Sequence, residues 1–157
     1  MLNSQSPSFA IYDASAGSGK TYALVKEYLK IILSASANDA YRNILAITFT
    51  NKAVQEMKSR IVGSLSEFAA SEPNQKALDL MQYLVDDSQN ATVKLSISGI
   101  QTKAQKIIKH IIHNYAAFDI STIDKFTHKV IRAFAHDLGL PMTFEVSLDS
   151  EDRKSVV

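Results

Sequence analysis

The most informative part of this sequence is Ala14-Ser15-Ala16-Gly17-Ser18-Gly19-Lys20-Thr21, a turn rich in small residues. A short apolar run, residues 8–12, precedes the turn and is typical of a buried strand. Over residues 20–33 the apolar positions recur every three or four residues, which predicts an amphipathic helix. A strand that enters a helix through a glycine-rich turn indicates an α/β protein.

Strand and helix patterns alternate along the rest of the chain. The predicted strands are residues 43–48, 117–123 and 143–148, and the predicted helices are residues 51–65, 75–87, 101–115 and 124–137. Thr50 or Asn51 can cap the helix over residues 51–65. We therefore expect one domain, residues 1–157, with a parallel sheet flanked by helices and a helical insertion at residues 72–116.

Composition restricts the possible functions. The 157 residues are 46% hydrophobic and carry a net charge of +1, so any site for a polyanion must be local. The chain has no cysteine, which excludes disulfides, cysteine metal sites and thiol nucleophiles. It also has neither a secretory signal nor an apolar stretch near the ~20 residues of a membrane helix. We therefore expect a cytoplasmic protein without a membrane partner.

The turn has the chemistry of a phosphate-binding loop, or P-loop. Its glycines allow successive backbone N–H groups to face one point, Lys20 can reach the β- and γ-phosphates, and the Thr21 hydroxyl can bind Mg²⁺. The strict pattern begins with glycine, and Ala14 stands at that position. The predicted ligands are ATP and Mg²⁺, and the predicted contacts are Ser15, Ala16, Gly17, Ser18, Gly19, Lys20 and Thr21.

A second group of candidate residues follows the predicted strand at residues 43–48. At the carboxyl end of a parallel strand, Thr48, Thr50 and Asn51 offer donors for a phosphate backbone. Phe49 offers a ring on which a base can stack, although a phenylalanine beside an apolar strand is equally expected in the core. For Lys52, Lys58 and Arg60, a DNA contact and a solvated helix face remain equal alternatives.

Two further motifs resemble the UvrD/RecB/AddA-type superfamily 1 DNA helicases. Residues 48–60 read Thr-Phe-Thr-Asn-Lys-Ala-Val-Gln-Glu-Met-Lys-Ser-Arg and resemble that family's motif Ia, with Val54 in place of alanine. Residues 120–126 resemble its Thr-Ile/Phe-His-Ser-Phe motif, with Asp124 and Lys125 in place of His and Ser. The family's phosphate loop also tends to begin with alanine, as this one does.

The resemblance implies an incomplete RecA-like P-loop NTPase, the N-terminal part of motor domain 1A. It implies that the parent protein translocates on single-stranded DNA in repair or recombination, as an ATP-dependent helicase or helicase–exonuclease. The implied partners are the rest of the helicase chain with its second motor domain, and a nuclease subunit. Unpaired sheet edges also predict self-association. The implied DNA contacts are Thr48, Phe49, Thr50, Asn51, Lys52, Thr122, Asp124 and Phe126.

An acidic pair, Asp86-Asp87, imitates the Asp-Glu motif with which such ATPases hold Mg²⁺ and activate water. Leu78, Met81 and Leu84 have helical spacing, so we interpret this pair as a helix end instead. The remaining alternatives are a small P-loop metabolite kinase and a nucleotide-binding module that does not hydrolyse ATP. Whether Gln5 contacts adenine stays open.

Overall fold

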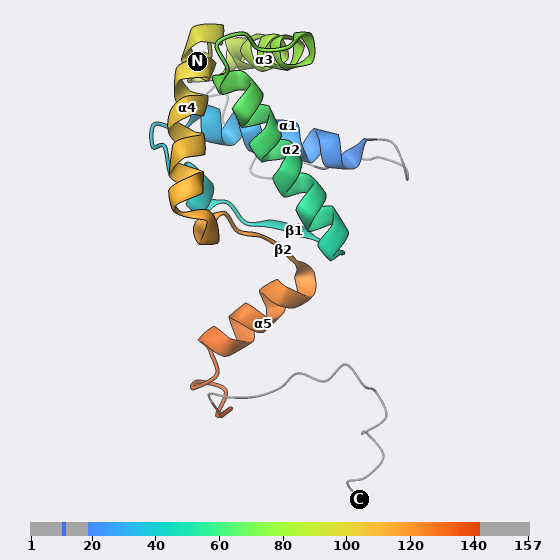
Figure 1. The fold of residues 1–157 in the computed structure, drawn as a ribbon. Coiled ribbons are helices and arrows are strands. Elements are labelled where there is room, and N and C mark those ends of the chain that lie inside the picture. Colours follow the sequence, from blue (N-terminus) through green and yellow to red (C-terminus); the bar gives the residue numbers. More distant parts are fainter. Residues whose placement is uncertain (1–10, 12–18, 142–157) are drawn as a thin grey trace, which may run out of the picture.

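The computed structural model describes Ile11 and residues 19–141. Its helices are α1 (Lys20–Ser34), α2 (Asn51–Ala69), α3 (Gln75–Asp87), α4 (Ile97–His113) and α5 (Ile123–Ala133), and its strands are β1 (Ala46–Thr48) and β2 (Ile120–Thr122). Short 3₁₀ turns, η1 (Ala40–Asn43), η2 (Ser88–Asn90) and η3 (Tyr115–Ala117), join these elements. The described part of the chain is a helix-rich α/β unit (Figure 1).

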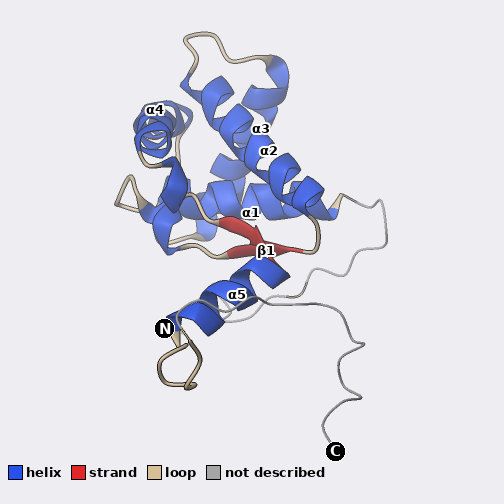
Figure 2. Ribbon diagram, turned by 60° about the horizontal axis from the view of Figure 1, so that its bottom comes forward, coloured by secondary structure: helices blue, strands red, loops and turns tan. Residues whose placement is uncertain are grey.

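The two strands pair in parallel, with Ala46 opposite Ile120 and Thr48 opposite Thr122. Helices α1 to α4 lie on one side of this pair and α5 lies on the other (Figures 1 and 2). The sequence predicts a parallel sheet, and the parallel pairing of these two strands agrees with that prediction. The predicted strands at residues 8–12, apart from Ile11, and at residues 143–148 lie outside the described residues.

Both strands are shorter than their apolar runs. The 3₁₀ turn η1 ends at Asn43, and Ile44 and Leu45 then lead into β1 without regular structure. The 3₁₀ turn η3 likewise occupies Ala117, where the strand was predicted to begin. In each case a 3₁₀ turn takes up the first residue of the run and the next two residues are irregular, so the ladder contains only three residues.

Side-chain caps define where four helices begin: Thr50 caps α2, Asn74 caps α3, Ser96 caps α4 and Thr122 caps α5. The Thr50 hydroxyl accepts the N–H of Ala53 at 3.1 Å, so the predicted cap of α2 is confirmed. The Ser96 hydroxyl accepts the N–H of Gly99 at 3.2 Å, and α4 therefore starts before the predicted residue 101. Helix α3 has the bounds that the sequence predicts, whereas α2 runs beyond residue 65 and α5 ends before residue 137.

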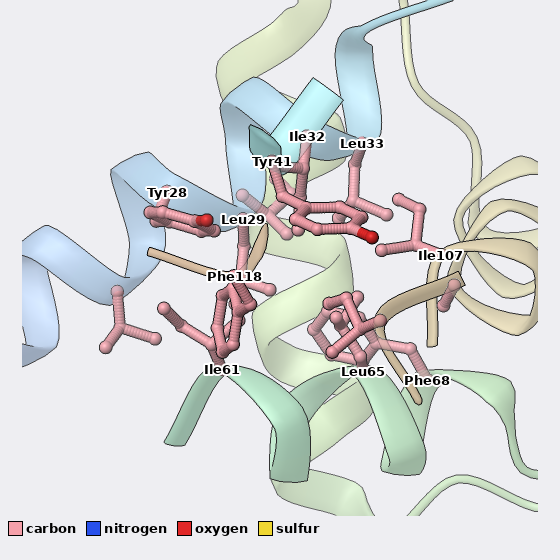
Figure 3. Packing of buried hydrophobic residues seen from close by; sticks show 14 of the residues in the cluster. Tyr28, Leu29, Ile32, Leu33, Tyr41, Ile61, Leu65, Phe68, Ile107 and Phe118 are labelled. Carbon is pink, nitrogen blue, oxygen red and sulfur yellow. The ribbon is translucent and has the colours of Figure 1, made fainter. Parts of the chain in front are cut away.

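The core lies where α1, α2 and α4 meet (Figure 3). Its largest fully buried side chains are Tyr41, Phe68, Phe118, Leu29, Ile32, Ile61, Leu65, Met81, Leu84, Ile100, Ile107 and Ile111. Phe118 lies edge-on to the rings of Tyr28, Tyr41 and Tyr115, with centroid separations of 5.9, 6.2 and 6.1 Å. Such edge-to-face contacts position the chain directly before β2 against α1 and η1.

Helices α3 and α4, which make up the predicted insertion, belong to this core. Helix α4 packs along α2. Lys103 of α4 donates hydrogen bonds to the carbonyls of Ser36 and Ala37 at 2.9 and 3.2 Å, after the end of α1. Burial, together with neighbouring Lys106, lowers the pKa of Lys103 below its ordinary value. The segment between residues 72 and 116 is therefore integral to the packing of the described unit.

Candidate functional site

The end of the phosphate loop is the part that the structure describes. Gly19 has φ of 85°, a left-handed conformation that favours glycine, and it is the N-cap of α1. Lys20 is exposed and Thr21 is half-buried in the first helical turn, which contains no acidic residue. Ser15, Ala16, Gly17 and Ser18 lie outside the described residues. The described part has features that suit an anion at a helix start: the backbone N–H groups of a first helical turn, a positive dipole end and a nearby lysine.

The end of β1 presents the first group of predicted DNA contacts. The Thr48 hydroxyl donates to the Thr50 carbonyl at 3.2 Å, and the Thr50 hydroxyl caps α2. Between them the ring of Phe49 is 86% exposed. The alternative that Phe49 belongs to the core is therefore wrong. Asn51 and Lys52 are exposed on the first turn of α2 beside it.

The end of β2 presents the second group. The parallel register places Thr122 beside Thr48, so the two strand ends share one edge of the sheet. Thr122 is 5% exposed, and its hydroxyl accepts the N–H of Lys125 at 3.3 Å as the cap of α5. Asp124 is exposed and Phe126 is half-buried. The structure thus brings together two segments that are about seventy residues apart, as expected from a parallel pair.

Three basic residues of α2 lie in different surroundings. Lys52 is exposed, and Arg60 forms an ion pair with Glu56 at 2.7 Å. Lys58 is half-buried, with its ammonium 5.1 Å from the centre of the Tyr115 ring. Sequence patterns did not reveal this contact, because the two residues lie on different helical elements and share no local spacing.

Asp86 and Asp87 are the last residues of α3, as predicted. Asp86 accepts a hydrogen bond from the Gln82 amide at 2.8 Å, and Asp87 forms an ion pair with Lys30 of α1. Among residues 19–141 and Ile11, no group of three or more His, Asp or Glu side chains could hold a metal. The interpretation of this acidic pair as a helix end is confirmed, and Asp87 joins α1 to α3.

A pocket of about 790 Å³ lies between α1, α2 and α3. Its walls include Tyr22, Lys26 and Tyr83, and the Lys26 ammonium lies 3.3 Å from the centre of the Tyr83 ring. The part of α2 that lines the pocket runs from Arg60 to Phe68, well away from the first turn of α2 at the strand ends. The pocket and the predicted DNA contacts are therefore separate features.

Comparison with known families shows to which family this chain belongs. The profile of the UvrD/REP helicase N-terminal domain matches residues 4–157. The chain belongs to the UvrD/REP helicase family. The resemblance carried by residues 48–60 and 120–126 is thus confirmed for this UvrD/REP-family chain.

Curated relatives of this UvrD/REP-family chain include helicase/nuclease subunits. An ATP-dependent helicase/nuclease subunit of Lactobacillus johnsonii is 35% identical over 139 residues, which are 88% of this chain and 9% of the relative. The subunit of the same name from Streptococcus agalactiae is 29% identical over 91% of this chain and 9% of the relative. The RecBCD enzyme subunit RecB of Haemophilus influenzae is 27% identical over 91% of this chain and 12% of the relative.

This UvrD/REP-family chain thus spans 9 to 12% of the length of these relatives. No solved structure matches it. In the part of the chain that the structure describes, no helix is both long and apolar enough to cross a membrane.

Proposed function

We propose that this chain is the ATP-binding part of an ATP-dependent DNA helicase or helicase–nuclease, and that it forms part of a RecA-like motor domain 1A. The family membership and the names of the relatives support this proposal. The structural observation that carries it is the start of α1, where left-handed Gly19 leads directly into Lys20 and Thr21. The proposed setting is DNA repair or recombination in the cytoplasm.

The proposed nucleotide site consists of the phosphate loop and the first turn of α1. Residues 15–19 supply backbone N–H groups for the phosphates, and the Lys20 ammonium offsets charge on the β- and γ-phosphates. Thr21 supplies a hydroxyl ligand for Mg²⁺, which when bound neutralises charge on the transferred phosphoryl group. The absence of an acidic residue from the first turn of α1 fits a polyphosphate at this position.

The proposed single-stranded DNA site is the shared edge of the two strand ends. Phe49 stacks on a base, and the side chains of Asn51 and Lys52 bind the backbone. Asp124 repels phosphate, so its carboxylate fits a base N–H instead. Phe126 is proposed to contact a base, and Thr122 contributes by positioning α5. Thr48 and Thr50 shape the turn that exposes the Phe49 ring.

The proposed partners are suggested by the names of the relatives and by the family resemblance. A helicase/nuclease subunit works with a nuclease activity and a RecBCD subunit works in a complex, so we propose a nuclease partner and a second motor domain for the whole protein. Unpaired edges of the described two-stranded sheet support self-association of the 157-residue chain as well.

A binding experiment tests the nucleotide site. Lys20→Ala in the 157-residue chain should weaken binding of a non-hydrolysable ATP analogue with Mg²⁺ by at least about tenfold, since a hydrogen bond to a charged group is lost. Isothermal titration calorimetry measures this affinity, and Lys94→Ala, a change at an exposed lysine before α4, is the matched control. Equal affinity of the Lys20→Ala and unaltered chains would show that the loop does not bind triphosphate.

A further inference from the structure

A cluster of charged and aromatic side chains lies beside the proposed DNA edge and comes from α2, η3, α5 and the chain before β2. It consists of Lys58 on α2, Tyr115 in η3, Asp119 before β2, and Lys125 and Lys129 on α5. We call these five residues the Lys58 patch. None of Tyr115, Asp119, Lys125 and Lys129 belongs to the predicted DNA contacts.

The ammonium of Lys58 is held by rings rather than by acceptors. It lies 5.1 Å from the centre of the Tyr115 ring and 5.6 Å from that of Phe118. Within the described ranges, Lys58 has no hydrogen-bond acceptor and no ion-pair partner. Burial lowers the pKa of Lys58, Asp119 offsets this in part, and Lys129 and Lys125 lower it further. A cation that has lost water and gained mainly ring contacts still attracts an anion.

The charges around Lys58 do not balance. Both carboxylate oxygens of Asp119 accept hydrogen bonds from the Lys129 ammonium, at 2.9 and 2.8 Å. The same carboxylate also attracts the Lys58 ammonium, which the ammonium groups of Lys129 and Lys125 repel. The half-buried Lys58 ammonium therefore lies near two exposed ammonium groups and one carboxylate, and a phosphate oxygen is suited to offset the excess positive charge.

Two further observations favour nucleic acid over a small anion. The ring of Tyr115 is 52% exposed, and a half-exposed aromatic beside lysines is the combination on which unpaired bases stack. Helix α5 also begins at the strand-end edge, and Lys125 and Lys129 stand on successive turns of it. The patch therefore continues from the proposed DNA edge toward the start of β2.

We propose that the Lys58 patch is a second contact site for single-stranded DNA, in which Lys58, Lys125 and Lys129 bind backbone phosphates and Tyr115 stacks on a base. This inference rests on the proposed function, because it extends the path of the same DNA strand beyond its proposed contact with Phe49. Duplex DNA is a poorer fit, since its bases are already stacked and leave no face for Tyr115.

The first test measures how salt affects binding of the 157-residue chain to a fluorescently labelled oligothymidylate by anisotropy. Each lost phosphate contact on a single strand lowers the slope of log K against log salt by about 0.7. Lys58→Gln and Lys129→Gln should each lower the slope by about this amount and weaken binding several-fold at low salt. Lys94→Gln removes the same charge at an exposed site before α4 and should change neither quantity.

The second test predicts a change in the opposite direction. Asp119→Asn removes the carboxylate that competes for Lys129, so oligothymidylate should bind several-fold more tightly and the salt slope should steepen. A purely structural role for the Asp119–Lys129 pair predicts weaker or unchanged binding instead. Tyr115→Leu should weaken binding about tenfold through the lost stack, whereas Tyr115→Phe keeps the ring and should preserve affinity.

The outcomes separate this inference from the proposed function. If Phe49→Ala weakens binding while the four patch changes match Lys94→Gln, the patch is not a contact and the DNA edge still stands. If the unaltered chain does not bind oligothymidylate, both are overturned. If the patch changes weaken binding to a duplex competitor and to oligothymidylate by equal factors, the patch is a general phosphate surface and the proposed stacking role of Tyr115 is wrong. Circular dichroism checks that each variant is folded. If Lys58→Gln does not fold, Lys129→Gln still tests the proposal, because Lys129 is exposed.

Discussion

Phe49 and Phe118 have the same side chain in opposite surroundings. Phe49 is 86% exposed because it lies between the end of β1 and the capping residue Thr50, whereas Phe118 is 1% exposed among three tyrosine rings. An exposed phenylalanine gains little from folding, so its position at the strand-end edge favours a role in binding.

Phe49→Ala should separate stability from binding. The free energy of unfolding should change by less than about 0.5 kcal/mol, since the ring is exposed. Affinity for single-stranded DNA should fall by ~1–3 kcal/mol, the worth of one stacked base. Phe118→Ala is the matched control and should cost about 3–5 kcal/mol of stability. Chemical denaturation and anisotropy measure the two quantities, and a Phe49→Ala chain with unaltered DNA affinity would remove Phe49 from the site.

The buried Tyr28 side chain leads to a prediction of how the free energy of unfolding changes at alkaline pH. Burial raises the pKa of Tyr28 well above its ordinary value of 10.0, and the neighbouring charges of Tyr41 and Asp119 raise it further. The folded state therefore holds this proton more strongly than the unfolded state does. The resulting stability is complete below pH 10 and is lost as the pH rises above it.

Urea denaturation at a series of pH values measures this loss. Tyr28→Phe should reduce the decline in the free energy of unfolding above pH 10, because the phenol that resists ionisation is gone. Tyr83→Phe, at an exposed tyrosine, should leave the decline unchanged. Identical alkaline declines for Tyr28→Phe and the unaltered chain would contradict the assignment.

At the scale of elements, α1 and α3 are held together by polar and aromatic contacts as well as by the core. Lys26 lies over the Tyr83 ring, and one turn later Lys30 pairs with Asp87. These two contacts are spaced four residues apart on each helix, and they connect the helix of the phosphate loop to the predicted insertion. The acidic end of α3 thus has Lys30 of α1 as its ion-pair partner.

Asp86→Asn should leave the Mg²⁺ dependence of nucleotide affinity unchanged within about twofold, since an exposed carboxylate is worth little. Asp87→Asn should lower stability by at most about 1 kcal/mol, because its pair with Lys30 is partly exposed. Calorimetry with and without Mg²⁺ measures the first effect, and thermal unfolding measures the second. A tenfold loss of the Mg²⁺ effect in Asp86→Asn would make this pair a metal ligand after all.

At the scale of the whole molecule, we expect the 157-residue chain to bind ATP without turnover. Its sequence contains no apolar strand that ends in Asp-Glu, and the acidic pair that imitates one is the end of α3. An arginine supplied by a second motor domain is typically worth 10³–10⁵ in rate. Steady-state phosphate release measures the rate of ATP turnover directly. DNA-stimulated turnover on the order of 1 s⁻¹ that Lys20→Ala abolishes would reveal a complete catalytic site.

Local patterns in the sequence were sufficient for the order of elements and for several of their ends. Apolar spacing predicts α1 and the bounds of α3, and a hydroxyl residue before an apolar helix predicts the cap at Thr50. These features depend on neighbours within about four residues, which is the range over which helical spacing and capping act. The strand–helix order also predicted a parallel sheet, whereas the pairing of β1 with β2 came from the structure.

Tertiary structure decided the exposure of Phe49, the true lengths of β1 and β2, the pair between Lys30 and Asp87, and the Lys58 patch. Lys58 and Tyr115 are on separate elements, and no period in the sequence relates them. Their contact depends on how α2 packs against α4 and on where the turn after α4 places its rings. Such contacts arise from long-range packing, which local spacing cannot specify.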